Sequence, residues 1–224
     1  MKLRPRTFLR GIHIAGHKTS TEHLPAERLP VPAEVAIPLS QHAGAPAEPV
    51  VQEGQAVRRG ELIAKSAGPV SANIHASVAG TVQSVGARPD GRGGTAQYIV
   101  IVPDETQQDA FLPPLSDPAP EEILARIEAC GLVGMGGAGF PTHVKLRPPV
   151  PVDTLILNGA ECEPYLTCDD ILMQKRRDEI MRGAKYMAKA LGVTRIIIAV
   201  EKNKPDAIAA FEHSDFDVVP LKKQ

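Results

Sequence analysis

Short apolar runs separated by glycine turns fill the first half of the chain. Between residues 31 and 105 the runs are only a few residues long, and turns such as Gln52–Gly54 and Arg58–Gly60 divide them. Closely spaced short strands of this kind are typical of a small all-β sandwich or barrel. We therefore expect an all-β domain over residues 31–105.

The spacing within this β domain resembles that of the barrel-sandwich hybrid in biotinyl and lipoyl carrier domains. Apolar residues alternate with Gly54 and Gly60 at three-residue spacing from Val51 to Ile63. Carrier domains hold a modified lysine in a hairpin, and the comparable hairpin here, Ser71–Ala76, contains no lysine. We expect the carrier fold without a covalently attached cofactor.

After Pro120 the pattern changes to alternating helices and strands. Two acidic residues follow Pro120, and Ile123, Leu124 and Ile127 share one face, which predicts a helix that ends at Gly131. Further along we expect a strand, a long helix, a strand, a short helix and a strand, over residues 154–158, 169–191, 195–200, 205–211 and 216–219. This order predicts an α/β layer with a mostly parallel sheet.

Two segments have no clear periodicity. Residues 1–30 lean basic and are expected to form an arm that lies in solvent or on another surface, such as a partner or a phospholipid. Residues 106–120 are rich in proline, which interrupts helices and central strands, so they are expected to be a linker. The predicted order is an arm over 1–30, a β domain over 31–105, a linker over 106–120 and an α/β domain over 121–224.

Charge and hydropathy exclude two classes of protein. The net charge is −1, whereas nucleic-acid binding needs a strong basic surface. The longest purely apolar runs resemble Ile196–Val200, whereas a membrane-spanning helix needs about 20 residues. No apolar segment of a secretory signal follows the basic start. We expect a cytoplasmic location, with any membrane attachment made through partners.

The cysteines and histidines give no clear metal site. The three cysteines, Cys130, Cys162 and Cys168, have no C-x-x-C spacing and cannot supply the four thiolates of an iron–sulfur cluster. Cys162 and Cys168 could touch a metal, but spectator thiols are the simpler interpretation. His13 and His17 have helical spacing, yet neighbouring glycines argue against a helix. We predict no metal ligands in this chain.

The strongest candidate for ligand binding is the glycine-rich segment from Gly134 to Lys145. Its glycines are Gly134, Gly136, Gly137 and Gly139. Glycine allows close approach of the backbone, and successive N–H groups form a concave anion site. Lys145 adds a positive charge and Phe140 a flat apolar face. The segment predicts a ligand with a phosphate and a flat ring.

The same glycines satisfy G-x-G-x-x-G, but they do not form an ordinary dinucleotide fingerprint. That fingerprint needs a strand before it and a helix after it. Here a helix precedes the glycines and Pro141 follows them closely. The alternative interpretation is a tight glycine turn that packs a helix on the sheet.

A second candidate segment follows the strand predicted over residues 154–158. Ligands of open α/β sheets bind at the carboxyl ends of strands, where Asn158, Glu161 and Glu163 are expected. The two carboxylates could accept hydrogen bonds from ribose hydroxyls, and Asn158 suits the edge of a heterocycle. The alternative is solvated loop charge. Asp169 and Asp170 are expected to cap the following long helix.

Two long motifs give the chain a close resemblance to a known family. The motifs are GLVGMGGAGFPTHVKL over residues 131–146 and NGAECEPYLTCDD over residues 158–170, with PLSQHAGAP over residues 38–46 ahead of them. Together they resemble RnfC (also RsxC), a component of Rnf-type electron-transport complexes. The two long motifs are shared with the FMN- and NADH-binding subunit of respiratory complex I.

The resemblance implies an α+β multidomain fold: a small biotinyl/lipoyl-like barrel-sandwich hybrid followed by a Rossmann-like α/β flavin module. FMN and NADH are the implied cofactors, with hydride passing from NADH to FMN. Electrons then reach ferredoxin, or flavodoxin, through iron–sulfur clusters and other Rnf subunits, coupled to ion transport at the cytoplasmic face of the membrane. The implied site is cofactor-binding, with no catalytic or metal residues assigned.

Residue roles follow from the matched motifs. The resemblance implies that the four glycines and Lys145 cradle the FMN phosphate and ribityl chain, and that Asn158 and Glu161 contact the flavin. It implies nicotinamide nucleotide binding for Phe140 and Glu163. The complex I relative has an aspartate where this chain has Ala160. That contact is missing here or is made by backbone.

The family chain continues beyond the point where this sequence ends. A further flavin-contacting loop of Gly-Gly-Glu type is expected just after Gln224, and the cluster cysteines later still. We expect the flavin module to be truncated on its C-terminal side, in a fragment or a naturally short homologue. Alone, the chain is expected to bind FMN weakly and to oxidise NADH negligibly.

Three functions remain open from the sequence. The first is an NADH-oxidising flavoprotein component of an Rnf complex. The second is a partner-docking module without redox chemistry. The third is a flavoprotein resembling cobalamin reductases, which the β domain ahead of the flavin module disfavours.

Overall fold

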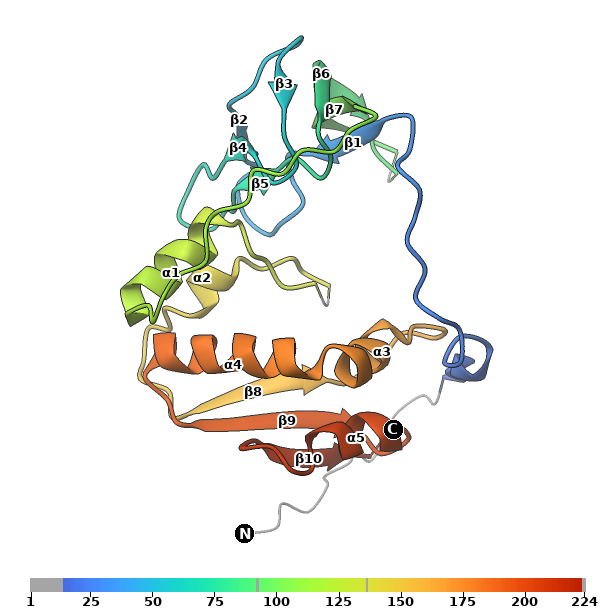
Figure 1. The fold of residues 1–224 in the computed structure, drawn as a ribbon, viewed down its shortest axis with the longest axis vertical. Helices are drawn as coiled ribbons and strands as arrows, with labels where there is room; N and C mark the ends of the chain where they lie inside the picture. The colour runs from blue at the N-terminus through green and yellow to red at the C-terminus, as the bar shows by residue number, and fades with distance from the viewer. Residues whose placement is uncertain (1–13, 92, 136, 223–224) are drawn as a thin grey trace. The chain divides into compact units, whose positions relative to one another are not determined.

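The computed structural model describes residues 14–91, 93–135 and 137–222 (Figure 1). The chain divides into two compact units. Leu29–Pro149 form one unit, and the described residues before Leu29 join those from Val150 onward in the other. The amino-terminal segment therefore belongs to the same unit as the last third of the chain.

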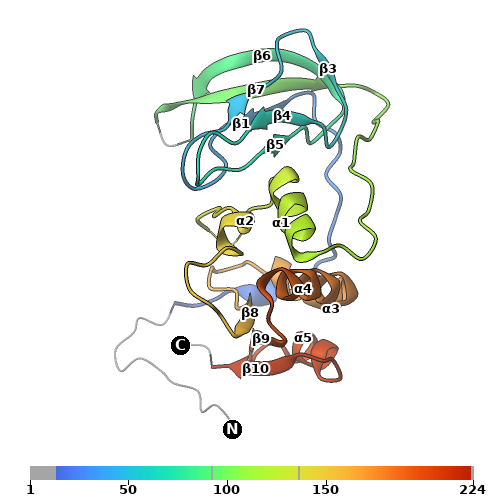
Figure 2. The same cartoon turned by 90° about the vertical axis from the view of Figure 1, so that its left-hand side faces the viewer.

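The first unit contains a β module of two antiparallel sheets, which Figure 2 shows facing each other. One sheet has the order β1-β7-β6-β3 and the other the order β2-β4-β5. Their strands are β1 (Val35–Pro38), β2 (Glu48–Pro49), β3 (Ala56–Val57), β4 (Leu62–Lys65), β5 (Ile74–His75), β6 (Gly80–Pro89) and β7 (Thr95–Pro103). Strand β1, which the apolar pattern did not predict, pairs along β7.

Aliphatic side chains from both sheets form the core of the β module. Ile63, Ile99 and Ile101 have no exposed surface, and Leu39 and Val82 pack in the same cluster. Burying each such side chain stabilises the fold by about 1.5–3 kcal/mol. The predicted all-β domain is confirmed.

Helix α1 (Pro120–Ala129) starts and stops as its sequence predicts. Pro120 occupies the first turn, and the Glu122 carboxylate accepts the Ala119 N–H at 2.7 Å. Gly131 ends the helix in a left-handed conformation with φ 62°. The last carbonyls of α1, from Glu128 and Ala129, accept the Asn73 side-chain amide at 3.3 Å each.

The second unit is a three-stranded parallel sheet with helices. The sheet has the order β10-β9-β8. Its elements are β8 (Thr154–Gly159), α3 (Cys168–Lys175), α4 (Arg177–Leu191), β9 (Arg195–Glu201), α5 (Pro205–Phe211) and β10 (Asp217–Leu221), with a 3-10 turn, η1 (Lys18–Ser20), from the amino-terminal segment (Figure 1). The predicted parallel α/β layer is confirmed.

The core of this unit lies on one face of the sheet. Leu155, Ile198 and Val200 pack with Ala184 of α4 and Phe211 of α5. Parallel strands are usually covered on both faces. Ile156, which points to the opposite face, remains 61% exposed.

The predicted long helix over residues 169–191 is wrong, since the chain forms α3 and α4 with a break at Arg176. Arg176 leaves the helical conformation at φ −125° and ψ 27°. Its guanidinium binds both oxygens of Glu179 in the first turn of α4, at 2.8 and 2.7 Å. The predicted caps are also wrong, because Thr167 holds the cap position of α3 and Asp169 and Asp170 lie inside its first turn.

In the part of the chain that the structure describes, no helix is both long and apolar enough to cross a bilayer.

We predict that Gly131→Ala destabilises the first unit by more than about 2 kcal/mol, because a positive φ and a backbone overlap act together. A Cβ at Gly131 would stand 2.0 Å from the Asn73 carbonyl oxygen. Gly54→Ala is the matched control, since Gly54 has φ 82° but open space around it, and it should cost only about 1 kcal/mol. Urea unfolding measures both, and equal losses would contradict the overlap.

Candidate functional site

The glycine-rich segment is a loop closed at its base. Val133 and Pro141 form an antiparallel bridge, and the Gly134 N–H donates to the Phe140 carbonyl at 2.9 Å. Between these ends the loop is open to solvent, and Met135 is 97% exposed. Gly137 has φ 127° with no neighbour near a built Cβ, so its backbone is accessible. Gly136 lies outside the described residues.

Lys145 lies beside the start of this loop. It ends the short helix α2 (Thr142–Lys145), which buried His143 and Leu146 hold against the unit. The Lys145 ammonium would stand 3.4 Å from a Cβ at Gly134. The predicted pairing of glycine loop and lysine is therefore present, with the charged end next to exposed backbone.

The β module supports the far side of the loop. The Gly139 carbonyl accepts the Ala43 N–H at 3.1 Å. A Cβ at Gly139 would approach the Gln41 carbonyl oxygen to 2.9 Å, and φ is 59°. Buried His42 fixes this support through contacts at 3.0 Å with the Ala45 carbonyl and the Ser71 hydroxyl. The close approach explains why a glycine stands at 139.

The second candidate segment follows β8 in the other unit. Asn158 is exposed, and its side-chain oxygen accepts the Ala160 N–H at 3.1 Å, while its NH₂ group makes no hydrogen bond to the described residues. Glu163 is exposed as well. Both side chains predicted at this strand end are therefore accessible to a ligand.

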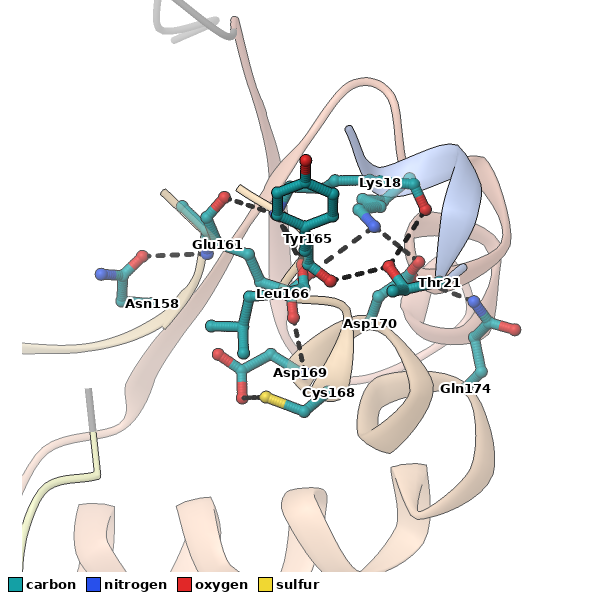
Figure 3. Close-up of polar contacts among 12 residues, drawn as sticks. Lys18, Thr21, Asn158, Glu161, Tyr165, Leu166, Cys168, Asp169, Asp170 and Gln174 are labelled. Carbon is teal, nitrogen blue, oxygen red and sulfur yellow. Dashed lines mark hydrogen bonds and ion pairs between the residues drawn. The ribbon is translucent and has the colours of Figure 1, made fainter. Parts of the chain in front are cut away.

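Glu161 is different, because its side chain is only 2% exposed. One carboxylate oxygen accepts the Asp169 N–H at 2.7 Å, at the start of α3. The other lies 3.6 Å from the Lys18 ammonium (Figure 3) and 3.4 Å from that of Lys204. The predicted pair of strand-end acids thus consists of one buried and one exposed carboxylate.

A second buried ion pair adjoins the first. The Lys204 ammonium donates to the Asp170 carboxylate at 2.8 Å, and both side chains are buried. Burial works against the charged ammonium, but the hydrogen bond and charge of Asp170, with the charge of Glu161, raise the pKa of Lys204 above its ordinary value. Two cations and two anions therefore balance in the interior.

Three potential ligand atoms lie close together at this end of the sheet. Glu161, Cys168 and Asp169 each bring one within 4.8 Å of the others. The set fits a cation poorly, because two ammonium groups already hold Glu161. Burial, and then the charges of Asp169 and Glu161, also raise the pKa of the Cys168 thiol and disfavour the thiolate that would bind a metal. Cys162 and Cys168 are free and exposed.

Lys18, Lys204 and Asp170 are the functional neighbours that sequence reasoning missed. Lys18 stands 143 residues from Glu161 in the sequence, and no local pattern connects them. The one signal was the pair His17-Lys18 in an otherwise unpatterned arm. His13 and His17 are not predicted to form a metal pair; His13 lies outside the described residues, and His17 stacks on Tyr165.

Two family models match the chain. The RnfC barrel sandwich hybrid domain matches residues 6–106, and the Nuo51 FMN-binding domain matches residues 127–217. The C component of the ion-translocating oxidoreductase complex of Rhodobacter capsulatus is 50% identical over 207 residues, which cover 89% of this chain and 40% of that protein. The chain belongs to the RnfC family.

Further relatives have more specific names. The corresponding component of the proton-translocating ferredoxin:NAD(+) oxidoreductase complex of Clostridium ljungdahlii is 44% identical over 226 residues, covering 96% of this chain and 50% of the relative. Its counterpart in a Na(+)-translocating complex from Acetobacterium woodii is 41% identical, covering 94% and 49%. This RnfC-family chain thus spans about half the length, or less, of these curated relatives. The expected β domain and flavin-binding domain are both present.

We predict that Asp169→Asn raises the Tm at pH 7. Partial burial, and then the charge of Glu161, raise the pKa of the Asp169 carboxyl in the folded protein. A raised folded-state pKa gives stability that is complete below the unfolded pKa and is lost as pH rises through the folded value. Ionised Asp169 therefore weakens the fold at neutral pH, and an amide avoids that loss.

The gain should shrink near pH 4, close to the ordinary pKa of aspartate. Asp206→Asn is the matched control, because Asp206 lies exposed in the first turn of α5. Calorimetry at both pH values measures the difference. A gain that stays constant with pH would contradict the electrostatic cause.

Proposed function

We propose that this RnfC-family chain binds FMN and NADH and serves electron transfer between NADH and ferredoxin, coupled by the complex to ion transport. The observation that carries the proposal is the glycine loop of residues 134–140, closed at its base, with the Lys145 ammonium beside it. This loop lies within the match to an FMN-binding domain. The names of relatives that act on ferredoxin and NAD(+) support the substrates.

The glycine loop suits the phosphate end of FMN. The exposed backbone at Gly137 and Ala138 can approach an anion closely, and Lys145 can supply a charge-assisted contact. In this proposal the predicted glycines, with Gly136 among them, hold the phosphate and ribityl chain. Phe140, which is half-buried, offers a ring face toward the nicotinamide nucleotide.

The strand-end segment suits the ring systems. The free NH₂ group of Asn158 can bind an edge of the flavin, and exposed Glu163 can accept hydrogen bonds from NADH. Glu161 is proposed to act on the flavin side of the same loop, where its buried ion pairs fix the backbone. A Rossmann-like arrangement of this unit, with the ligand at the carboxyl end of β8, is part of the proposal.

The remaining steps belong to the rest of the complex. We propose that electrons leave FMN through iron–sulfur clusters and then through other Rnf subunits. Attachment to the cytoplasmic face of the membrane would be made through those subunits. A docking module without redox chemistry is the second candidate, and absence of flavin absorption in a purified full-length RnfC protein would favour it.

Lys145→Ala is expected to weaken FMN binding roughly ten- to a hundredfold, since a charge-assisted contact contributes about 1.5–3 kcal/mol. The measurement is a fluorescence titration of a full-length RnfC protein that carries this segment. Lys65→Ala removes the same charge from the β module and should leave the affinity unchanged. Equal FMN affinity in Lys145→Ala and the wild type would sink the phosphate role.

Glu163→Gln is expected to raise the KM for NADH while leaving the flavin content intact. The exposed carboxylate is proposed to accept hydrogen bonds from the nucleotide, which an amide makes less well. Steady-state dye reduction by the full-length protein gives KM, and the visible spectrum gives flavin content. Loss of flavin with a normal KM would assign Glu163 to FMN instead.

A further inference from the structure

An amino-terminal strap, Gly16–Thr21, is built into the unit that contains the strand-end segment. The strap packs against the loop Glu161–Thr167, which lies more than 140 residues further along the chain (Figure 3). This strap lies within the match to the barrel-sandwich domain and outside the match to the FMN-binding domain. The division of the chain into compact units nevertheless assigns it to the second unit.

Lys18 ties the two ends of the loop together. Its ammonium donates to the Glu161 carbonyl at 2.7 Å and to the Leu166 carbonyl at 2.8 Å. The Glu161 carboxylate lies 3.6 Å away and supplies the opposite charge. Two of the three ammonium donors thus bind backbone carbonyls, and the carboxylate adds an ion pair, in a site where Lys18 is only 6% exposed. An apolar side chain at this position would leave the buried Glu161 carbonyl and the partly buried Leu166 carbonyl without this donor.

Tyr165 has a backbone conformation that needs outside support. Its φ is 65°, in the left-handed region that side chains other than glycine rarely adopt. The strap makes three contacts with Tyr165. Its N–H donates to the Gly16 carbonyl at 2.8 Å, and its carbonyl accepts the Thr21 hydroxyl at 2.7 Å. Its ring stacks on His17 with centroids 5.2 Å apart and an angle of 13° between the planes.

The residues between these fixed points are exposed. Cys162, Glu163 and Pro164 are open to solvent, while Glu161 before them is buried and fixed. Glu161 also accepts the first-turn amide of α3 and pairs with Lys204 ahead of α5. A loop fixed at both ends can present Glu163 in one orientation, which a ligand contact requires.

We propose that Lys18 is a positioning residue that holds the loop Glu161–Thr167 in its ligand-binding shape without touching the ligand. The proposal rests on the function proposed above for Glu163. It makes the amino-terminal strap a functional part of the nucleotide site. The strap, predicted as an arm in solvent or on a partner, thus has its binding surface within its own chain.

The first test follows the loop without any ligand. Lys18→Met keeps most of the side-chain stem and removes the charge and the donors. Amide hydrogen exchange of residues 161–167 is expected to become about tenfold faster, with exchange in β9 unchanged. Lys202→Met is the matched control, an exposed lysine of the same unit. Unchanged exchange of the loop in Lys18→Met would overturn the proposal.

The second test uses the full-length protein and separates positioning from general stability. Lys18→Met is expected to raise the KM for NADH about tenfold while kcat changes little, because the loop must be ordered when the nucleotide binds. Lys18→Arg, which keeps the charge and several donors, should recover most of the wild-type KM. A loosened loop with an unchanged KM would overturn the positioning role.

A milder variant covers the case in which Lys18→Met does not fold. Thr21→Val removes only the hydroxyl that donates to Tyr165, and the same loosening of the loop is expected to a smaller degree. Failure of the wild-type protein to bind FMN or NADH would refute the proposed function alone. The exchange experiment on the loop would still decide the role of Lys18.

Discussion

The buried carboxylate of Glu161 is the constraint on which the second unit depends. A carboxylate removed from water is tolerated only when cations and hydrogen bonds replace its hydration. Lys18, Lys204 and the Asp169 amide do this here, and Asp170 balances the second lysine. Losing one partner of such a set typically costs about 3–5 kcal/mol, because the remaining charge stays buried. Three segments distant in sequence, which contain Lys18, residues 161–170 and Lys204, are thereby required to meet at the carboxyl end of β8.

Each candidate segment also depends on residues from the first fifty of the chain. The strand-end loop needs Lys18 from the strap. The glycine loop leans on the β module, where the Ala43 amide binds the Gly139 carbonyl and a side chain at 139 would collide with Gln41. Each candidate segment is thus contacted by residues that lie within the barrel-sandwich match, residues 6–106. The match to an FMN-binding domain over residues 127–217 therefore includes the proposed ligand-facing segments, but it does not include the residues of the first fifty that support them.

The sequence predicted most of the elements that depend on local order, but it missed one local helix break and the contacts between distant residues. Gly131 at the end of α1, the helix Pro205–Phe211 and the parallel strands follow from turn residues and periodicity, and all are present. The break at Arg176 was missed, since periodicity continues across it and only a local ion pair with Glu179 marks it. The burial of Glu161 was missed because its two cations lie far from it in sequence.

In the β module, the hairpin that bears the modified lysine in carrier domains makes structural contacts. The hairpin Ser71–Ala76, which carries the modified lysine in carrier domains, here places Asn73 at the end of α1. The Asn73 carbonyl lies so close to Gly131 that no side chain fits between them. A hairpin packed in this way holds the helix that leads into the glycine loop, and we expect it to fix this neighbouring segment rather than to carry a cofactor. Function follows the residues at a site rather than the fold that carries them.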